Sequence, residues 1–70
     1  MLPQVTGAQV VRALAKIGYY VARQKGSHIS LRGGPGAALT IPNHDPIAKG
    51  TLRSIIRDAG LTVDEFVALL

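Results

Sequence analysis

The amino-acid sequence predicts an α+β fold in which a three-stranded antiparallel sheet carries helices on one of its faces. Apolar residues recur at helical spacing towards both ends of the chain, and short segments in its middle alternate apolar with polar residues. The chain has 70 residues and no internal repeat, which leaves room for one hydrophobic core. We therefore expect residues 1–70 to form a single domain.

The first helix is predicted over residues 6–17. Thr6 is a suitable N-cap, and Gly18 ends the helix because glycine readily adopts the left-handed conformation that follows a last helical turn. The apolar positions of this segment share one helical face: Val10, Val11, Leu14 and Ile17.

Three strands are predicted next, over residues 19–24, 28–32 and 38–42. Residues 25–27 form a tight turn between the first two strands, and the glycine-rich residues 33–36 form the turn before the third. Because short turns join strands that run in opposite directions, the three strands are expected to form an antiparallel meander.

Alternation along the strands predicts the direction of their side chains. The residues expected to face the core are Ile29, Leu31, Leu39 and Ile41. The residues of the second strand expected to face solvent are His28, Ser30 and Arg32. Tyr19 and Tyr20 point to opposite sides, so one of them could stack on a nucleic-acid base, although packing in the core or the hairpin accounts for both.

A second helix is predicted from about Gly50 to Ala59, and a short third helix begins at Thr62, where Thr62 and Glu65 match a capping box. The resulting order is α-β-β-β-α with an extra short C-terminal helix. It is similar to the double-stranded-RNA-binding fold, in which helices cover one side of a three-stranded meander. The other face of the sheet is then open to solvent.

Composition narrows the choice of partners and compartment. Eight Lys and Arg against four Asp and Glu give a net charge of +4, which favours a polyanion or an acidic protein as partner, or serves only to keep a small protein soluble. The chain has no cysteine, no export signal and no apolar run long enough to span a membrane, so we expect a cytoplasmic protein.

Few residues could carry chemistry, and several kinds of site are disfavoured. The four carboxylates are scattered over a loop and helix ends, so neither a metal site nor a cofactor is predicted. Ser27 and His28 are adjacent in the chain and would point to opposite faces, which disfavours a Ser-His-acid triad. Residues 33–36 lead into a strand and lack a following Lys-Ser or Lys-Thr, which disfavours a phosphate-binding loop.

His28 is the candidate catalytic residue, because it opens a strand on the solvent-facing side and an imidazole exchanges protons near neutral pH. RNA cleavage needs this ability, since the RNA's own 2′-hydroxyl must lose a proton and the leaving oxygen must gain one. The alternative is that His28 is only a polar residue on a solvated strand. His44, in a loop, could be a second acid or base, a binding residue or a turn residue.

Cations near His28 and on the second helix are candidates for binding phosphate. Arg53 and Arg57 lie four residues apart on one helix face, which suits phosphates, an acidic protein surface or simple solvation. By position, Gly26 is expected to be needed for the turn and Ser27 to help orient RNA. The full set of candidate RNA-binding residues is Arg23, Lys25, Ser27, Arg32, Arg53 and Arg57.

The motif Gly26-Ser27-His28, together with the segments around it, resembles the HicA (YcfA-like) mRNA interferase toxins of bacterial and archaeal toxin–antitoxin pairs. The similarity extends over nearly the whole chain. Its segments are Gly18-Tyr19, Arg23-Gln24-Lys25-Gly26-Ser27-His28, Ile41-Pro42-Asn43-His44, residues 50–60 and Glu65-Phe66.

The resemblance implies a double-stranded-RNA-binding-like fold used as a metal-independent nuclease, with one catalytic histidine that corresponds to His28. It also implies mRNA as substrate and a HicB antitoxin that covers the active site. This chain departs from many relatives in two places. Ile29 stands where they have a second histidine, and the glycine-rich residues 33–36 replace a charged hairpin.

Two other functions compete with this interpretation. A non-catalytic double-stranded-RNA-binding module could share the fold and the charge, but such modules rely on a lysine-rich helix N-terminus, where this chain offers only Lys49. A basic domain that docks an acidic protein is the other alternative. RNA cleavage distinguishes the nuclease from both.

Overall fold

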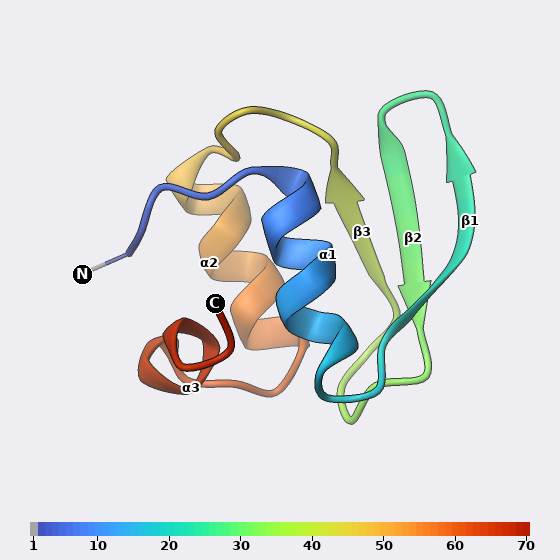
Figure 1. Cartoon of the computed structure of the whole chain (residues 1–70). Coiled ribbons are helices and arrows are strands. Elements are labelled where there is room, and N and C mark those ends of the chain that lie inside the picture. The colour runs from blue at the N-terminus through green and yellow to red at the C-terminus, as the bar shows by residue number, and fades with distance from the viewer. Residues whose placement is uncertain (1) are drawn as a thin grey trace.

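A helix, three strands and two further helices follow one another along residues 2–70, which the computed structural model describes (Figure 1). They are α1 (Gly7–Ala15), β1 (Tyr20–Lys25), β2 (His28–Arg32), β3 (Leu39–Pro42), α2 (Lys49–Asp58) and α3 (Val63–Val67). The predicted order is confirmed, with element ends displaced by a few residues. No helix in this part of the chain has the length and apolar character needed to cross a membrane.

The end of α1 shows why the predicted helix over 6–17 closes at Gly18. The Tyr19 N–H donates to the Leu14 carbonyl at 3.2 Å, and the Gly18 N–H donates to the Ala15 carbonyl at 3.2 Å. These two bonds form a Schellman motif around Gly18, whose φ of 105° is accessible to glycine. The start of α1 is equally well defined, because Thr6 and Gln9 form a capping box.

The strands form one antiparallel sheet in the order β1-β2-β3, as predicted. Ile29 pairs with Ile41, and Leu31 pairs with Leu39, so these residues share one face of the sheet. All of them are buried, which confirms the predicted core face. On the opposite face of β2, His28 and Arg32 are exposed.

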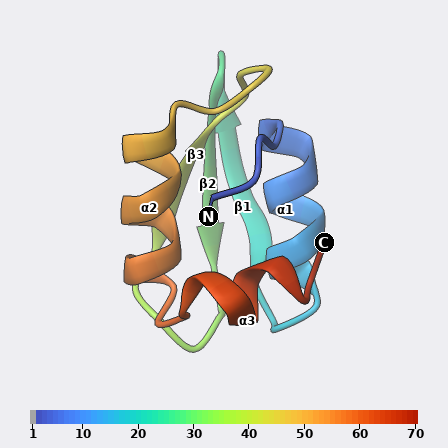
Figure 2. The ribbon, with the colours of Figure 1, turned by 90° about the vertical axis from the view of Figure 1, so that its left-hand side faces the viewer.

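The helices all lie on the buried side of the sheet and leave its other face open (Figure 1). Helices α1 and α2 run side by side, and α3 lies across their ends (Figure 2). Phe66 of α3 is fully buried in the same hydrophobic cluster as Leu14 of α1 and Leu52 of α2. The capping box predicted for Thr62 and Glu65 is present at the start of α3.

A close contact at Gly7 joins the start of α1 to the end of β3. A Cβ atom on Gly7 would lie 2.5 Å from the Pro42 carbonyl oxygen and 2.9 Å from the Asn43 Cα, so only glycine fits without movement of the backbone. The Gly7 N–H donates to the His44 carbonyl at 2.9 Å, and the Ile47 N–H donates to the Val5 carbonyl at 2.8 Å. The loop after β3 is therefore held against the segment that leads into α1.

We predict that Gly7→Ala lowers the free energy of unfolding by about 1–3 kcal/mol, because the added methyl group overlaps backbone atoms that cannot move independently. Chemical denaturation followed by circular dichroism measures this change. Gly50→Ala is the matched control, since nothing lies within 4 Å of a Cβ at that helical position. It is expected to stabilise the protein by up to about 1 kcal/mol. Equal stability of the two variants would contradict the close contact.

Candidate functional site

The open face of the sheet brings together most of the candidate site residues. His28 and Arg32 point to this face from β2. Cross-strand pairing adds residues of β1, since directly opposed residues of antiparallel strands share a face. Lys25 pairs with His28, Arg23 with Ser30, and Tyr20 with Arg32.

A β-bulge in β1 determines this arrangement. The pairing register shifts between Val21 and Arg23, and Ala22 has no partner on β2. Regular alternation from Tyr20 would have turned Arg23 and Lys25 towards the helix side of the sheet. The extra residue reverses the alternation, so both cations lie on the same face as His28.

The turn between β1 and β2 places His28 at one end of the open face. Only Gly26 and Ser27 separate the paired residues Lys25 and His28. Gly26 has a φ of 58°, whereas Ser27 has a negative φ, the pattern of a type II′ hairpin turn with glycine at its first position. The Ser27 carbonyl accepts a hydrogen bond of 2.7 Å from the Asn43 N–H, which ties the turn to the segment after β3.

His44 lies at the same end of the sheet as His28. Pro42 pairs directly with His28, and Asn43 and His44 continue the chain from there. The His44 side chain is exposed, while its carbonyl accepts the hydrogen bond from Gly7. Asn43, which sequence reasoning did not single out, contributes the backbone bond to Ser27. In the sequence, Asn43 was marked only as part of the segment Ile41-Pro42-Asn43-His44, one of those that resemble the HicA family.

The open face is positively charged and carries no compensating acid. The three strands contain no Asp or Glu, and no ion pair involves Arg23, Lys25 or Arg32 within residues 2–70. All three cations are exposed. The face therefore presents unpaired positive charge beside a histidine, which attracts phosphate groups.

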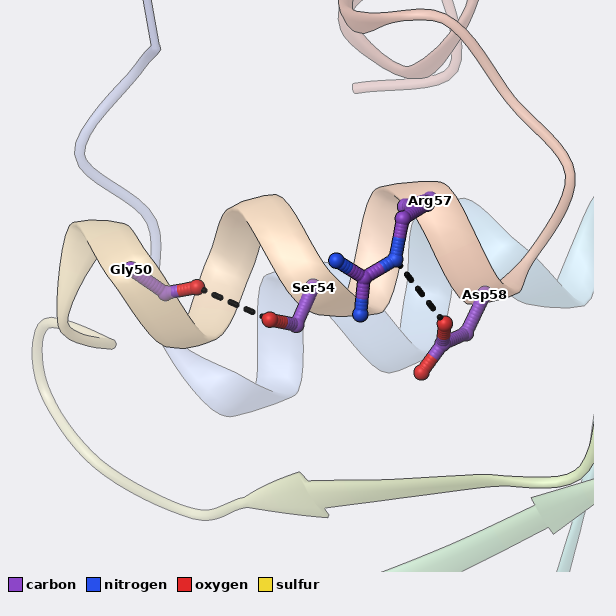
Figure 3. A network of polar contacts seen from close by, with 4 residues as sticks. All are labelled: Gly50, Ser54, Arg57 and Asp58. Carbon is purple, nitrogen blue, oxygen red and sulfur yellow. Dashed lines mark hydrogen bonds and ion pairs between the residues drawn. The ribbon is translucent and has the colours of Figure 1, made fainter.

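Arg53 and Arg57 lie elsewhere. Both belong to α2, and α2 and β1 occupy opposite sides of the molecule (Figure 1). The Arg57 Nε lies 3.3 Å from the Asp58 Oδ1, and both side chains are largely solvated, so this pair adds little stability (Figure 3). In the same view Ser54 donates to the Gly50 carbonyl at 3.3 Å. The structure does not bring Arg53 and Arg57 to the face that carries His28.

The two adjacent tyrosines differ sharply in their environment. Tyr19 is buried and its hydroxyl donates to the Ala37 carbonyl at 2.8 Å, so it belongs to the core. Tyr20 is 59% exposed on the open face beside Arg32. The sequence indicated that they point to opposite sides, but not which one is buried.

Across residues 2–70, no three His, Cys, Asp or Glu side chains are grouped so that they could hold a metal ion.

The family model of the HicA toxin of bacterial toxin–antitoxin systems matches residues 7–61, which is more than half of the chain. The chain belongs to the HicA toxin family. The matched region includes α1, the three strands and α2, and therefore the whole open face. No curated protein matches the sequence. Membership of the HicA family gives the chain a toxin role in a toxin–antitoxin system, in which an antitoxin is its partner.

We predict that Gly26→Ala lowers the free energy of unfolding of this HicA toxin by about 1–2 kcal/mol, because alanine is strained at a φ of 58°. Ser27→Ala is the matched control, since Ser27 bonds to Asn43 through its carbonyl and that group is retained. This control is expected to stay within about 0.5 kcal/mol of wild type. Urea denaturation of both variants checks the prediction, and similar losses would argue against a conformational requirement for glycine.

Proposed function

We propose that this HicA toxin is a metal-independent endoribonuclease that cleaves mRNA, with His28 as the general acid or base. One observation supports this proposal above the others. His28 stands exposed at the end of an open sheet face on which Arg23, Lys25 and Arg32 carry unpaired positive charge. A proton-transfer group and phosphate-binding cations thus share one accessible surface.

These groups match the needs of RNA cleavage by the substrate's own 2′-hydroxyl. A base removes the 2′-hydroxyl proton as O2′ forms a bond to phosphorus, and the bond from phosphorus to the leaving O5′ breaks as O5′ gains a proton. His28 would serve in one of these two proton transfers, and His44, at the same end of the sheet, is the candidate for the other. Guanidinium and ammonium groups offset the negative charge that develops on the phosphoryl oxygens.

The cations of the open face would hold the RNA backbone. Lys25 is paired with His28 in the sheet and would contact the phosphate closest to the reaction, while Arg23 and Arg32 would bind phosphates farther along the face. Ser27, in the turn before His28, would help to orient the substrate. Arg53 and Arg57 would form a separate contact on α2, for a longer RNA or for the antitoxin.

The proposed partner is a HicB-type antitoxin that covers the open face and so blocks His28. An acidic surface on this antitoxin would match the unpaired cations, and it would compete with RNA for the same charges. Because mRNA is the proposed substrate, the cytoplasm is the proposed site of action. A short gene for an acidic protein beside the toxin gene is the genomic observation expected from this proposal.

We predict that His28→Ala reduces cleavage of single-stranded RNA by about 10²–10⁴-fold, the usual contribution of a positioned acid or base. Purified protein and gel analysis of RNA fragments measure this loss. Induced expression of wild type is expected to arrest growth and deplete mRNA, and expression of His28→Ala is expected to do neither. RNA binding should persist in the variant, because its cations are unchanged.

Ser30→Ala is the matched control, since Ser30 lies next but one to His28 on the same face and has no ionisable group. It should cleave RNA nearly as wild type does, and EDTA should not abolish cleavage by either protein. Equal cleavage or toxicity from a folded His28→Ala would refute the catalytic role, and loss of activity in EDTA would refute metal independence. RNA binding without cleavage by wild type would favour a binding module, and antitoxin binding without any RNA binding would favour a protein-interaction domain.

We also predict that Arg23→Gln and Arg32→Gln each weaken RNA binding and flatten its salt dependence. Each lost phosphate contact should lower the slope of log K against log salt by about 0.7 for single-stranded RNA. Fluorescence anisotropy at several salt concentrations measures this slope for a short RNA. Arg53→Gln, on the other side of the molecule, serves as control and should leave the slope for a short RNA unchanged. The same loss in all three variants would contradict a binding site confined to the open face.

A further inference from the structure

Tyr20 is the most exposed large hydrophobic side chain among residues 2–70, with 59% of its surface accessible. It pairs with Arg32 and therefore lies on the open face, at the end of β1 remote from the Lys25–His28 pair. Burial does not account for an aromatic ring in this position, since more than half of its surface stays in water. Its neighbour Tyr19 supplies the contrast, with its ring buried and its hydroxyl bonded to Ala37.

Gly33 holds the Tyr20 ring in place from one side. A Cβ atom on Gly33 would lie 2.5 Å from Cε2 and 2.7 Å from Cδ2 of this ring, so the ring rests against the glycine backbone where no side chain fits. Gly33 also has a φ of 89°, which favours glycine at this position. The ring is thus supported before any ligand arrives, which lowers the entropy cost of binding to it.

The surroundings of Tyr20 specify the kind of ligand. Arg32 lies directly across from Tyr20, and Arg23 follows along the same face, with no carboxylate on the three strands. An exposed aromatic ring beside unpaired guanidinium groups suits a ligand that has both flat apolar rings and phosphates. Single-stranded nucleic acids are bound in this way, with bases stacked on aromatic side chains and the backbone held by cations.

We propose that Tyr20 is a base-stacking platform that selects single-stranded RNA and positions it along the open face towards His28. This inference rests on the proposed function for the location of the cleaved bond. Tyr20 and Lys25 are five steps apart along the strand, a span of roughly 16 Å. The stacked base therefore lies a few nucleotides from the cleaved bond. Bases inside an A-form duplex are already stacked on each other and are excluded from the platform.

The test measures binding in the His28→Ala background, so that cleavage does not interfere. A labelled single-stranded RNA is titrated with this protein and with versions that also carry Tyr20→Ala or Tyr20→Phe. Tyr20→Ala is expected to weaken binding by about 5- to 150-fold, the range for loss of one stacked base. Tyr20→Phe keeps the aromatic ring and should bind nearly as the parent does. The salt slope should be the same for all three, because stacking releases no counterions.

A second measurement uses protein with the natural Tyr20, so it does not depend on whether a variant folds. Abasic nucleotides are placed one at a time along the RNA, and binding of each RNA is compared with that of the intact strand. One position, a few nucleotides from the bond cut by wild type, should lose affinity as Tyr20→Ala does. Combining this abasic RNA with Tyr20→Ala should cause no further loss, since both changes remove the same contact.

Equal binding by Tyr20→Ala and Tyr20→Phe, or uniform effects of abasic nucleotides at every position, would overturn the inference. An equal loss of affinity for duplex RNA would also overturn it, because a duplex offers no free base. The proposed function is judged separately, by cleavage in wild type and its loss in His28→Ala. If wild type binds RNA without cleaving it, the nuclease proposal fails while the binding comparison still decides the role of Tyr20.

Discussion

Burial of one sheet face under the helices controls the direction of the side chains on β2 and β3. Ile29, Leu31, Leu39 and Ile41 are all buried, and each contributes roughly 1.5–3 kcal/mol relative to an exposed side chain. A slip of one residue in the pairing would turn all of these side chains to solvent, so the register is strongly specified. His28 is exposed for the same reason, because the residues of β2 that alternate with Ile29 and Leu31 must face the opposite side of the sheet.

The same constraint leaves the protein with an open sheet face. Its cations have no acidic neighbours on the strands, so their charge is available to an external partner. In the proposed function, RNA and an antitoxin both use this surface, which makes their binding mutually exclusive. A toxin of this size can thus be silenced by occupying the site itself, without any change in its fold.

The ends of the elements also converge near His28. Gly7 brings α1 against the end of β3, and the Asn43 N–H binds the Ser27 carbonyl in the turn before His28. The segment that contains His44 is held between these two contacts. Residues far apart in the chain are therefore fixed around one end of the sheet by backbone contacts, which are largely independent of the side chains that would do chemistry.

The sequence by itself determined the order of elements, the N-cap at Thr6, the capping box at Thr62, and the faces of β2 and β3. These features depend on local periodicity and on hydrogen bonds between residues close in the chain. Only the tertiary structure decided that Arg23 and Lys25 share the face of His28, because the bulge at Ala22 arises from pairing between strands. It likewise decided that Tyr20 is the exposed tyrosine and that α2 carries Arg53 and Arg57 away from the sheet face, since burial depends on contacts between distant segments.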